Sequence, residues 1–447
     1  MIMTMTAKVS RLVRHTLVAA PLAFAPAATS VLLQTAGFDS LTSGSVQAQE
    51  AKPEYKTKKT YSLRQPVFKD FARVQEKTDA NDWKGALAVL KDLERSKAPG
   101  YTSFEKANLW NYYGWVYYSL EDYNSSIRYY RKVLVETELS DALEIGTLKT
   151  LAQLMFVQED WKNAIKMLQQ YMKVNPIIGA DDYALLSQAY YQDGDMAQSL
   201  KNINIAVTKV EGTGKIPKEN WYTLQRAIYY DKGDYKKVID ILTKLVRHYP
   251  KGSYWKQLAG MYGAVEQERN QMYAMETAYL MGALDKETEL MNLAYLMMGS
   301  DVPYKAAKII DKGMKEGKIS ESSKNLEVLA TAWRMAQNVK TAIPIMEKAA
   351  AKSGDGDLYA RLAGIYLDSD NNEKAIEVGG KALKRGGIKR PDQLQIVLGM
   401  ANTNLKKYDA AIKAFKEAAK DKRSEQFAAQ WLQFAQGELE RERSLNL

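Results

Sequence analysis

The sequence predicts an all-α protein, a right-handed superhelical solenoid of about ten helix-turn-helix repeats that ends in a C-terminal capping helix. The chain of 447 residues contains only 27 Gly and 11 Pro, too few for the many turns of an all-β protein of this length. Its hydrophobic fraction of 46% and charged fraction of 26% are those of a folded chain rather than a disordered one. From Pro66 onward, a helical pattern of apolar residues recurs about every 33 to 40 residues, as in stacked helical hairpins.

The N-terminus has the features of a secretory signal peptide. A basic stretch around Arg11 precedes residues 16–33, which carry no charge and are rich in Ala, Val and Leu. A stretch of small residues then ends at Ala48, where the sequence resembles a cleavage site. We therefore expect a signal peptide over 1–48 and a mature protein exported to the periplasm, with no membrane span. An uncleaved membrane anchor and cleavage nearer Ala28 are the alternatives.

The rest of the chain divides by its pattern into a linker, a repeat region and a tail. Residues 49–65 are polar and basic, with no apolar period, and are interpreted as a linker. Residues 66–437 carry the repeats, and the last of their helices has an apolar face suited to a cap. Residues 438–447 are expected to form a charged C-terminal tail.

Large and small residues recur at fixed offsets along the repeat region. In the clearest unit, Trp110 is followed by Gly114, Tyr117 and Ser126. This pattern closely resembles that of the tetratricopeptide repeat, a pair of antiparallel helices that binds other proteins. The resemblance covers 66–437 and implies an interaction scaffold rather than an enzyme, although a fold alone does not name the partner.

Each recurring position in the resemblance has a packing role. A small residue such as Gly114 lets the first helix of a hairpin approach the second closely, and a small Ala in the second helix acts in the same way. Turn pairs such as Gly194-Asp195 end one helix and begin the next. Because one hairpin cannot bury its own apolar face, neighbouring hairpins must stack. Phe427, Trp431 and Phe434 give the final helix its apolar face.

The composition leaves few routes to catalysis. The chain has no Cys and only two His, which excludes thiol nucleophiles, thiolate zinc sites and histidine-based triads. Residues 212–215 lack the Ser or Thr of a phosphate loop, and residues 368–379 lack the Gly and Glu of a calcium loop. We therefore expect no catalytic residue, no cofactor and no metal site. The net charge of +10 is spread along the chain, so nucleic acid is not an expected partner.

The candidate site is a concave groove along the first helices of the N-terminal repeats. In tetratricopeptide repeats the second, fifth, ninth and twelfth residues of the first helix face this groove, and the eleventh faces the core. Tyrosine doublets place Tyr117, Tyr190 and Tyr229 in the core by this register. The expected aromatic groove residues are Trp115, Tyr118, Phe156, Tyr191 and Tyr230. The expected polar groove residues are Asn108, Asn111, Lys149, Gln153, Gln188 and Asn220.

These residue types suit recognition of a peptide or helix from a protein partner. Aromatic rings are common anchors in interfaces, and amide side chains can hydrogen-bond a peptide backbone. The alternative is that the aromatic rings serve packing, against one another or against the linker.

The overall layout and the Tyr-rich N-terminal repeats resemble exported tetratricopeptide proteins associated with TonB/ExbB/ExbD-type energy-transduction systems of Gram-negative bacteria. That resemblance implies a TonB/ExbB/ExbD-like complex as partner and an accessory role in TonB-dependent uptake. A scaffold for envelope or polysaccharide assembly is the alternative. A carbohydrate-binding or sugar-active protein is a further one, but Asp181, Glu327 and Asp357 are too widely spaced along the repeats to act as a carboxylate pair.

Overall fold

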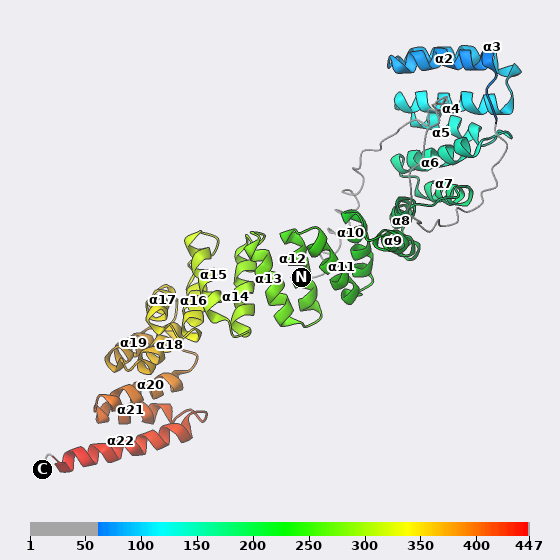
Figure 1. The fold of residues 1–447 in the computed structure, drawn as a ribbon. Helices are drawn as coiled ribbons and strands as arrows, with labels where there is room; N and C mark the ends of the chain where they lie inside the picture. The colour runs from blue at the N-terminus through cyan, green and yellow to red at the C-terminus, as the bar shows by residue number, and fades with distance from the viewer. Residues whose placement is uncertain (1–60, 446–447) are drawn as a thin grey trace, which may run out of the picture. The chain divides into compact units, whose positions relative to one another are not determined.

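The computed structural model describes residues 61–445. The predicted signal peptide over 1–48, and most of the predicted linker over 49–65, lie outside these residues. Every regular element between residues 61 and 445 is a helix, and none is a strand, which confirms the all-α repeat fold (Figure 1). No helix in this part of the chain is long and apolar enough to cross a bilayer. The chain forms two compact units, which meet in sequence between Asp234 and Tyr235.

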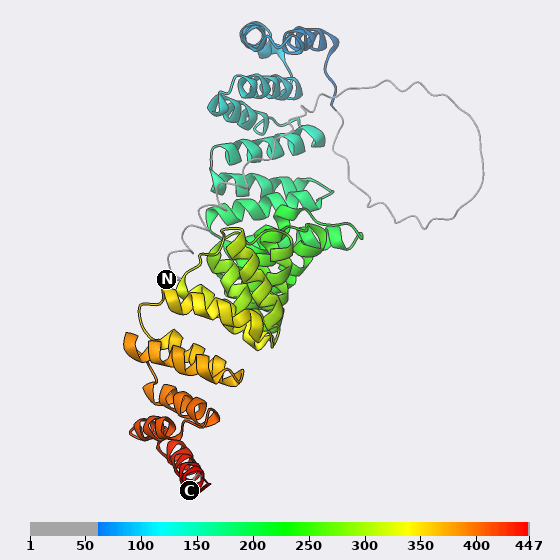
Figure 2. The same cartoon turned by 90° about the vertical axis from the view of Figure 1, so that its left-hand side faces the viewer.

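The first unit consists of helical hairpins stacked one on the next (Figures 1 and 2). The hairpins are α2/α3, α4/α5, α6/α7 and α8/α9, and α10 packs on the last of them. The elements are α2 Gln65–Asp79, α3 Trp83–Ser96, the 3-10 turn η1 Ala98–Gly100, α4 Ser103–Ser119, α5 Tyr123–Val133, α6 Asp141–Val157, α7 Trp161–Val174, α8 Ala180–Asp193, α9 Met196–Glu211 and α10 Glu219–Asp231.

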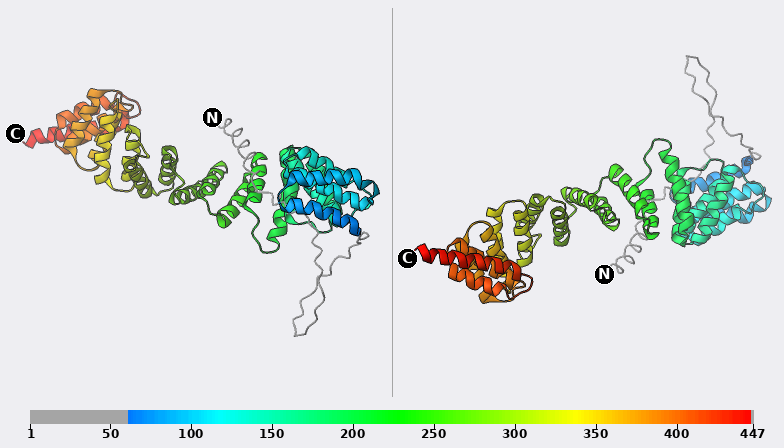
Figure 3. Two further views of the ribbon diagram at one scale, coloured as in Figure 1. Left: turned by 90° about the horizontal axis from the view of Figure 1, so that it is seen from above. Right: turned by 90° about the horizontal axis from the view of Figure 1, so that it is seen from below.

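The second unit repeats the same arrangement and ends in a single long helix. Its hairpins are α12/α13, α14/α15, α16/α17, α18/α19 and α20/α21, with α11 before them and α22 lying along α21 (Figure 3). The helices are α11 Tyr235–His248, α12 Gly252–Ala264, α13 Glu268–Leu280, α14 Glu287–Gly299, α15 Pro303–Lys315, α16 Ser323–Met335, α17 Val339–Lys352, α18 Asp357–Asp368, α19 Asn372–Arg385, α20 Pro391–Asn404, α21 Tyr408–Ala418 and α22 Glu425–Leu445. The fifth predicted repeat is thus divided, with α10 in one unit and α11 in the other.

The close approach predicted at Gly114 is present. A Cβ atom added to Gly114 would lie 2.7 Å from the ring of Tyr130 on the second helix of the same hairpin. The Ser126 hydroxyl of that second helix donates a 2.7 Å hydrogen bond to the Gly114 carbonyl. A glycine at this position therefore lets an aromatic ring and a buried hydroxyl both pack against the first helix.

The first three hairpin turns share one arrangement that joins the two helices. At the turn between α6 and α7, Glu159 has a φ of +56°, in the left-handed region. The next residue, Asp160, caps α7, because its carboxylate accepts hydrogen bonds from the backbone N–H and the side-chain amide of Asn163. Asn81-Asp82 and Glu121-Asp122 make the preceding turns in the same way. The left-handed residue reverses the chain, and the aspartate satisfies the first turn of the new helix.

The last residues of the predicted linker are tied to the first unit. Tyr61 stacks on Phe104 with ring centroids 5.6 Å apart. The Nε of Arg64 donates a 2.8 Å hydrogen bond to the buried carboxylate of Glu105, which also accepts from the backbone N–H of Thr102 at the start of α4. The hydrogen bond from Arg64 outweighs burial and lowers the pKa of Glu105 to about 2.

The C-terminal helix α22 caps the second unit. Trp431 stacks on the buried Phe415 of α21, with ring centroids 6.0 Å apart. The helix continues to Leu445, so most of the segment expected as a charged tail is helical. Glu, Leu and Arg, which have high helix propensity, predominate in that segment and explain the extension.

Candidate functional site

A cavity of about 530 Å³ lies on the face of the first unit formed by first helices of its hairpins. We call it the first-helix cavity. Its walls come mainly from α6, α8 and α10. The predicted groove residues that line it are Lys149, Gln153, Gln188 and Asn220. The other lining residues are Asp181, Asp182, Ala184, Leu185, Ile203, Lys218, Trp221 and Leu224.

Helical spacing explains why these side chains meet. Lys149 and Gln153 are four residues apart on α6, so they lie on one face of that helix. On α8, Asp181, Leu185 and Gln188 follow the same face in steps of three and four. Because successive first helices stack side by side, these faces form one continuous surface. Register alone therefore brings together residues that are about 70 positions apart in the chain.

Two ion pairs flank the first-helix cavity. The Lys149 Nζ lies 3.0 Å from the Asp182 carboxylate, whose side chain is only 9% exposed. Burial lowers the pKa of Lys149, but the hydrogen bond and charge of Asp182 outweigh burial and raise it above its ordinary value. Lys218 pairs with Asp181 and lies over the ring of Trp221, 5.5 Å from its centroid. The charges at the cavity walls are therefore balanced in pairs.

Between the ion pairs, the lining combines apolar and amide groups. The half-buried Leu185 offers apolar surface above the buried Trp221 and Leu224, while the amides of Gln153 and Gln188 can both donate and accept hydrogen bonds. Asp182 is further engaged, because it accepts a 2.9 Å hydrogen bond from the backbone N–H of Gly179 at the start of α8. This mixture can hold the side chains and the backbone of a peptide segment.

Four of the predicted aromatic groove residues, which we call the aromatic ladder, do not line this cavity: Tyr118, Phe156, Tyr191 and Tyr230. Tyr191, expected in the groove, is buried, with 6% of its surface exposed. Tyr118 is half-buried, and its ring centroid is 5.8 Å from that of Tyr123. Phe156 is also half-buried and packs edge-on against Trp161, 5.3 Å away. Only Tyr230 of this ladder is exposed, at 41%.

The position of these rings in the hairpin explains the difference. Position twelve of the repeat lies just before the turn, beside the first residue of the second helix. In the hairpins of Tyr118 and Phe156 that first residue is itself aromatic, Tyr123 or Trp161, so the rings pack together across the turn. The packing alternative therefore describes Tyr118 and Phe156. Tyr191 is buried, against expectation, and of these four aromatic residues only Tyr230 is exposed.

The other predicted positions differ from expectation in smaller ways. Trp115 packs edge-on against Trp83, 5.6 Å away, at the start of α3. Asn108 donates a hydrogen bond to the carbonyl of Phe104 in its own helix, and Asn111 is half-buried outside the cavity. The eleventh-position tyrosines, Tyr117, Tyr190 and Tyr229, are half-buried rather than buried. In α4 the fully buried ring belongs instead to Tyr113.

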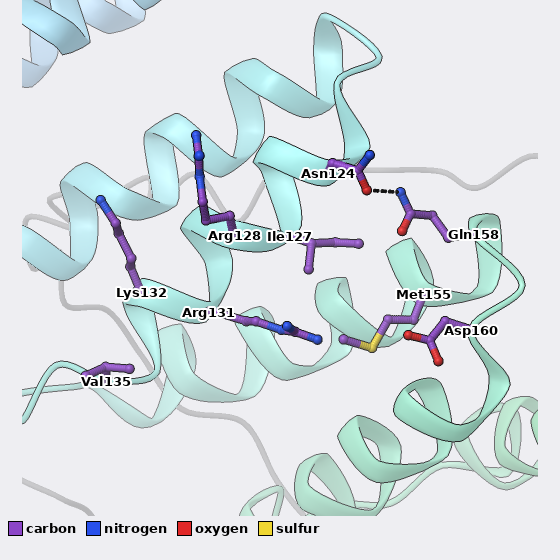
Figure 4. A pocket seen from close by; sticks show the side chains of 9 residues that line it. All are labelled: Asn124, Ile127, Arg128, Arg131, Lys132, Val135, Met155, Gln158 and Asp160. Carbon is purple, nitrogen blue, oxygen red and sulfur yellow. Dashed lines mark hydrogen bonds between the residues drawn. The ribbon is translucent and has the colours of Figure 1, made fainter.

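A further cavity of about 440 Å³, which the sequence reasoning missed, opens beside α5. We call it the second-helix cavity, because most of its lining comes from the second helix of a hairpin (Figure 4). Its residues are Asn124, Ile127, Arg128, Arg131, Lys132, Val135, Met155, Gln158 and Asp160. The signal was present in the sequence, since the residues of 124–135 in this set recur in steps of three and four along one helical face.

The described residues hold no cluster of three or more His, Asp or Glu side chains that could bind a metal ion. Each aspartate of the first-helix cavity is paired with a lysine. The arrangement is therefore suited to binding by shape, hydrogen bonds and balanced charge.

Family models match two parts of the chain. Residues 393–420, which contain most of α20 and α21, match the tetratricopeptide repeat. Residues 51–210 match the RNPP family C-terminal domain, and the described part of this match runs from α2 to α9. No curated protein matches the chain.

Solved structures with repeated helical hairpins are similar at low identity. A tetratricopeptide repeat protein from Parabacteroides merdae is 16% identical, with a TM-score of 0.28, and the match covers 57% of this chain and 98% of that one. YrrB, described as a TPR protein with an unusual peptide-binding site, is 14% identical, with a TM-score of 0.32 and coverage of 42% and 89%. The TPR2AB domain of yeast Sti1, in a complex with pHSP90, is 14% identical, with a TM-score of 0.30 and coverage of 65% and 98%. TM-scores this low support no inference about this chain.

Proposed function

We propose that this tetratricopeptide repeat protein is a non-catalytic interaction scaffold that binds a peptide segment of a protein partner in the first-helix cavity. The observation that carries the proposal is the cavity itself, where Lys149, Gln153 and Gln188 converge beside apolar surface. An extended segment could place an apolar side chain on Leu185 while its backbone meets the two glutamine amides. The lysine–aspartate pairs would orient polar groups at either side.

The proposed partner belongs to a TonB/ExbB/ExbD-like complex in the periplasm. Support for this partner is the resemblance of the chain's layout and Tyr-rich first repeats to exported proteins of such systems. Support for the location is the signal-peptide pattern of residues 1–48. In this proposal the scaffold is an accessory component of TonB-dependent uptake.

Site-specific photo-crosslinking tests both parts of the proposal. A photoreactive amino acid would replace Gln188 inside the cavity and, in a control, Asn111, which is a predicted groove residue outside it. We expect a discrete crosslinked species with Gln188 substituted and not with Asn111 substituted, in periplasmic extracts. Mass spectrometry of the species then identifies the partner.

Crosslinks of equal yield at both positions, or at Asn111 alone, would contradict a site in the first-helix cavity. A single crosslinked partner from polysaccharide assembly would keep the site and replace the TonB proposal.

A further inference from the structure

The second-helix cavity differs from the first in its charge. It is lined by the cations of Arg128, Arg131 and Lys132, and its one lining carboxylate belongs to Asp160. Asp160 is already engaged, because both of its oxygens accept hydrogen bonds from Asn163 at the start of α7. The cavity therefore carries a net positive charge that its own lining does not neutralise.

Arg131 is the cation that points into this cavity. Figure 4 shows its side chain extending toward Met155 and Asp160, below Ile127. No ion pair joins Arg131 to any residue of the described chain, 61–445. Lys132 is directed elsewhere, since its Nζ lies 4.2 Å from the ring centroid of Trp110 and 3.7 Å from Glu94. Arg128 is held near the ring of Tyr129, with 5.3 Å between its guanidinium carbon and the ring centroid.

The rest of the lining adds apolar surface and hydrogen-bonding groups. The half-buried Ile127 and the buried Met155 lie beside the Arg131 guanidinium, and Val135, two residues beyond the end of α5, is 81% exposed. At the opposite end, the Gln158 amide donates a 2.9 Å hydrogen bond to Asn124. A guanidinium next to the half-buried Ile127, with the exposed Val135 nearby, fits a ligand that carries carboxylates and apolar groups in alternation.

We propose that the second-helix cavity binds an acidic, apolar peptide segment of a protein partner, with a Glu or Asp carboxylate on Arg131. A carboxylate can accept two parallel hydrogen bonds from a guanidinium, which fixes its orientation as well as its position. Aliphatic side chains of the same segment lie on Ile127 and Val135. The scaffold then has two peptide sites of different charge in its first unit, and the second does not depend on the first.

Fluorescence polarisation with labelled synthetic peptides tests this site on the mature protein. The probe is a peptide in which Glu alternates with Leu, and its counterpart has Gln in place of Glu. We expect the Glu peptide to bind, and binding to weaken as salt is raised. Arg131→Gln should lower the affinity by about fivefold or more, because it removes the charge-assisted hydrogen bonds.

Arg73→Gln is the matched control, because Arg73 is an exposed arginine of α2 in the same unit and its loss changes the net charge equally. We expect this control, and Gln153→Ala with Gln188→Ala in the first-helix cavity, to change the affinity by less than about twofold. The proposal is overturned if the Glu peptide does not bind, if the Gln peptide binds equally well, or if Arg73→Gln weakens binding as much as Arg131→Gln. A circular dichroism melt of each variant confirms that it is folded.

Discussion

At the scale of single residues, one missing side chain decides how closely two helices can pack. Gly114 faces the ring of Tyr130, and the Ser126 hydroxyl bonds to its carbonyl. The sequence showed this requirement directly, because Gly, Ala or Ser recurs at the same position of the repeats. The burial of Tyr191 was not visible in the same way. The burial of this ring depends on which residue begins the next helix and on the path of the turn that joins the two helices. The residue type at one position reveals neither of these.

We predict that Gly114→Ala lowers the free energy of unfolding by about 1–3 kcal/mol. The added methyl group would lie 2.7 Å from Tyr130, so the ring or the helix must shift. Gly146→Ala is the control within α6, where an added Cβ meets no atom within 4 Å. Its helix should gain up to about 1 kcal/mol from the better helix propensity of Ala. Urea denaturation of both variants checks the prediction, and an equal response would show that the close approach is not what limits position 114.

At the scale of helices and turns, the sequence predicted the helices better than the turns between them. Helix pairs, their order and the capping helix follow from the apolar period, because each hairpin buries one stripe of each helix. The residues that form the turns were harder to predict from the sequence. Gly194 ends α8 in the left-handed region, as expected, but Asn81, Glu121 and Glu159 take the same backbone conformation without being glycine. The following aspartate caps, rather than the residue's own preference, fix these turns.

The turn at Glu159 gives a prediction at this scale. A non-glycine residue at a φ of +56° costs about 1–2 kcal/mol. Glycine removes this cost but also raises the conformational entropy of the unfolded chain, which offsets part of the gain. Glu159→Gly should therefore stabilise the first unit by about 0.5–1 kcal/mol. The exposed residue Lys166 in the middle of α7 provides the control, because Lys166→Gly should destabilise by about 1 kcal/mol. Thermal melts of the two variants should move in opposite directions. A melting temperature lowered by Glu159→Gly would mean that the glutamate side chain stabilises the turn.

At the scale of the whole molecule, the repeat pattern predicted a solenoid over 66–437, and neighbouring hairpins stack in this way within each of the two compact units. The division falls inside the fifth predicted repeat, whose Gly233-Asp234 turn signal is as regular as that of its neighbours.

The stacking of repeats also determines which predicted groove residues lie together in the candidate site. Four residues of the groove register, Lys149, Gln153, Gln188 and Asn220, line one cavity, because stacking places equivalent positions of successive first helices side by side. It did not identify Trp221 or Leu224, which lie outside the register positions used. It also missed the cavity beside α5, since the resemblance directs attention to first helices alone.

In the proposed complex, the first-helix cavity, and not the rest of the predicted groove, holds the partner segment. The most direct test is isothermal titration of the crosslinked partner's peptide into purified variants. Gln153→Ala with Gln188→Ala should lower the affinity by about tenfold or more, because two amides that hydrogen-bond the peptide are lost. Asn108→Ala with Asn111→Ala, at predicted groove positions outside the cavity, should leave the affinity within about twofold. If the asparagine pair weakens binding as much as the glutamine pair, or if the glutamine pair binds like the wild type, the claim is wrong.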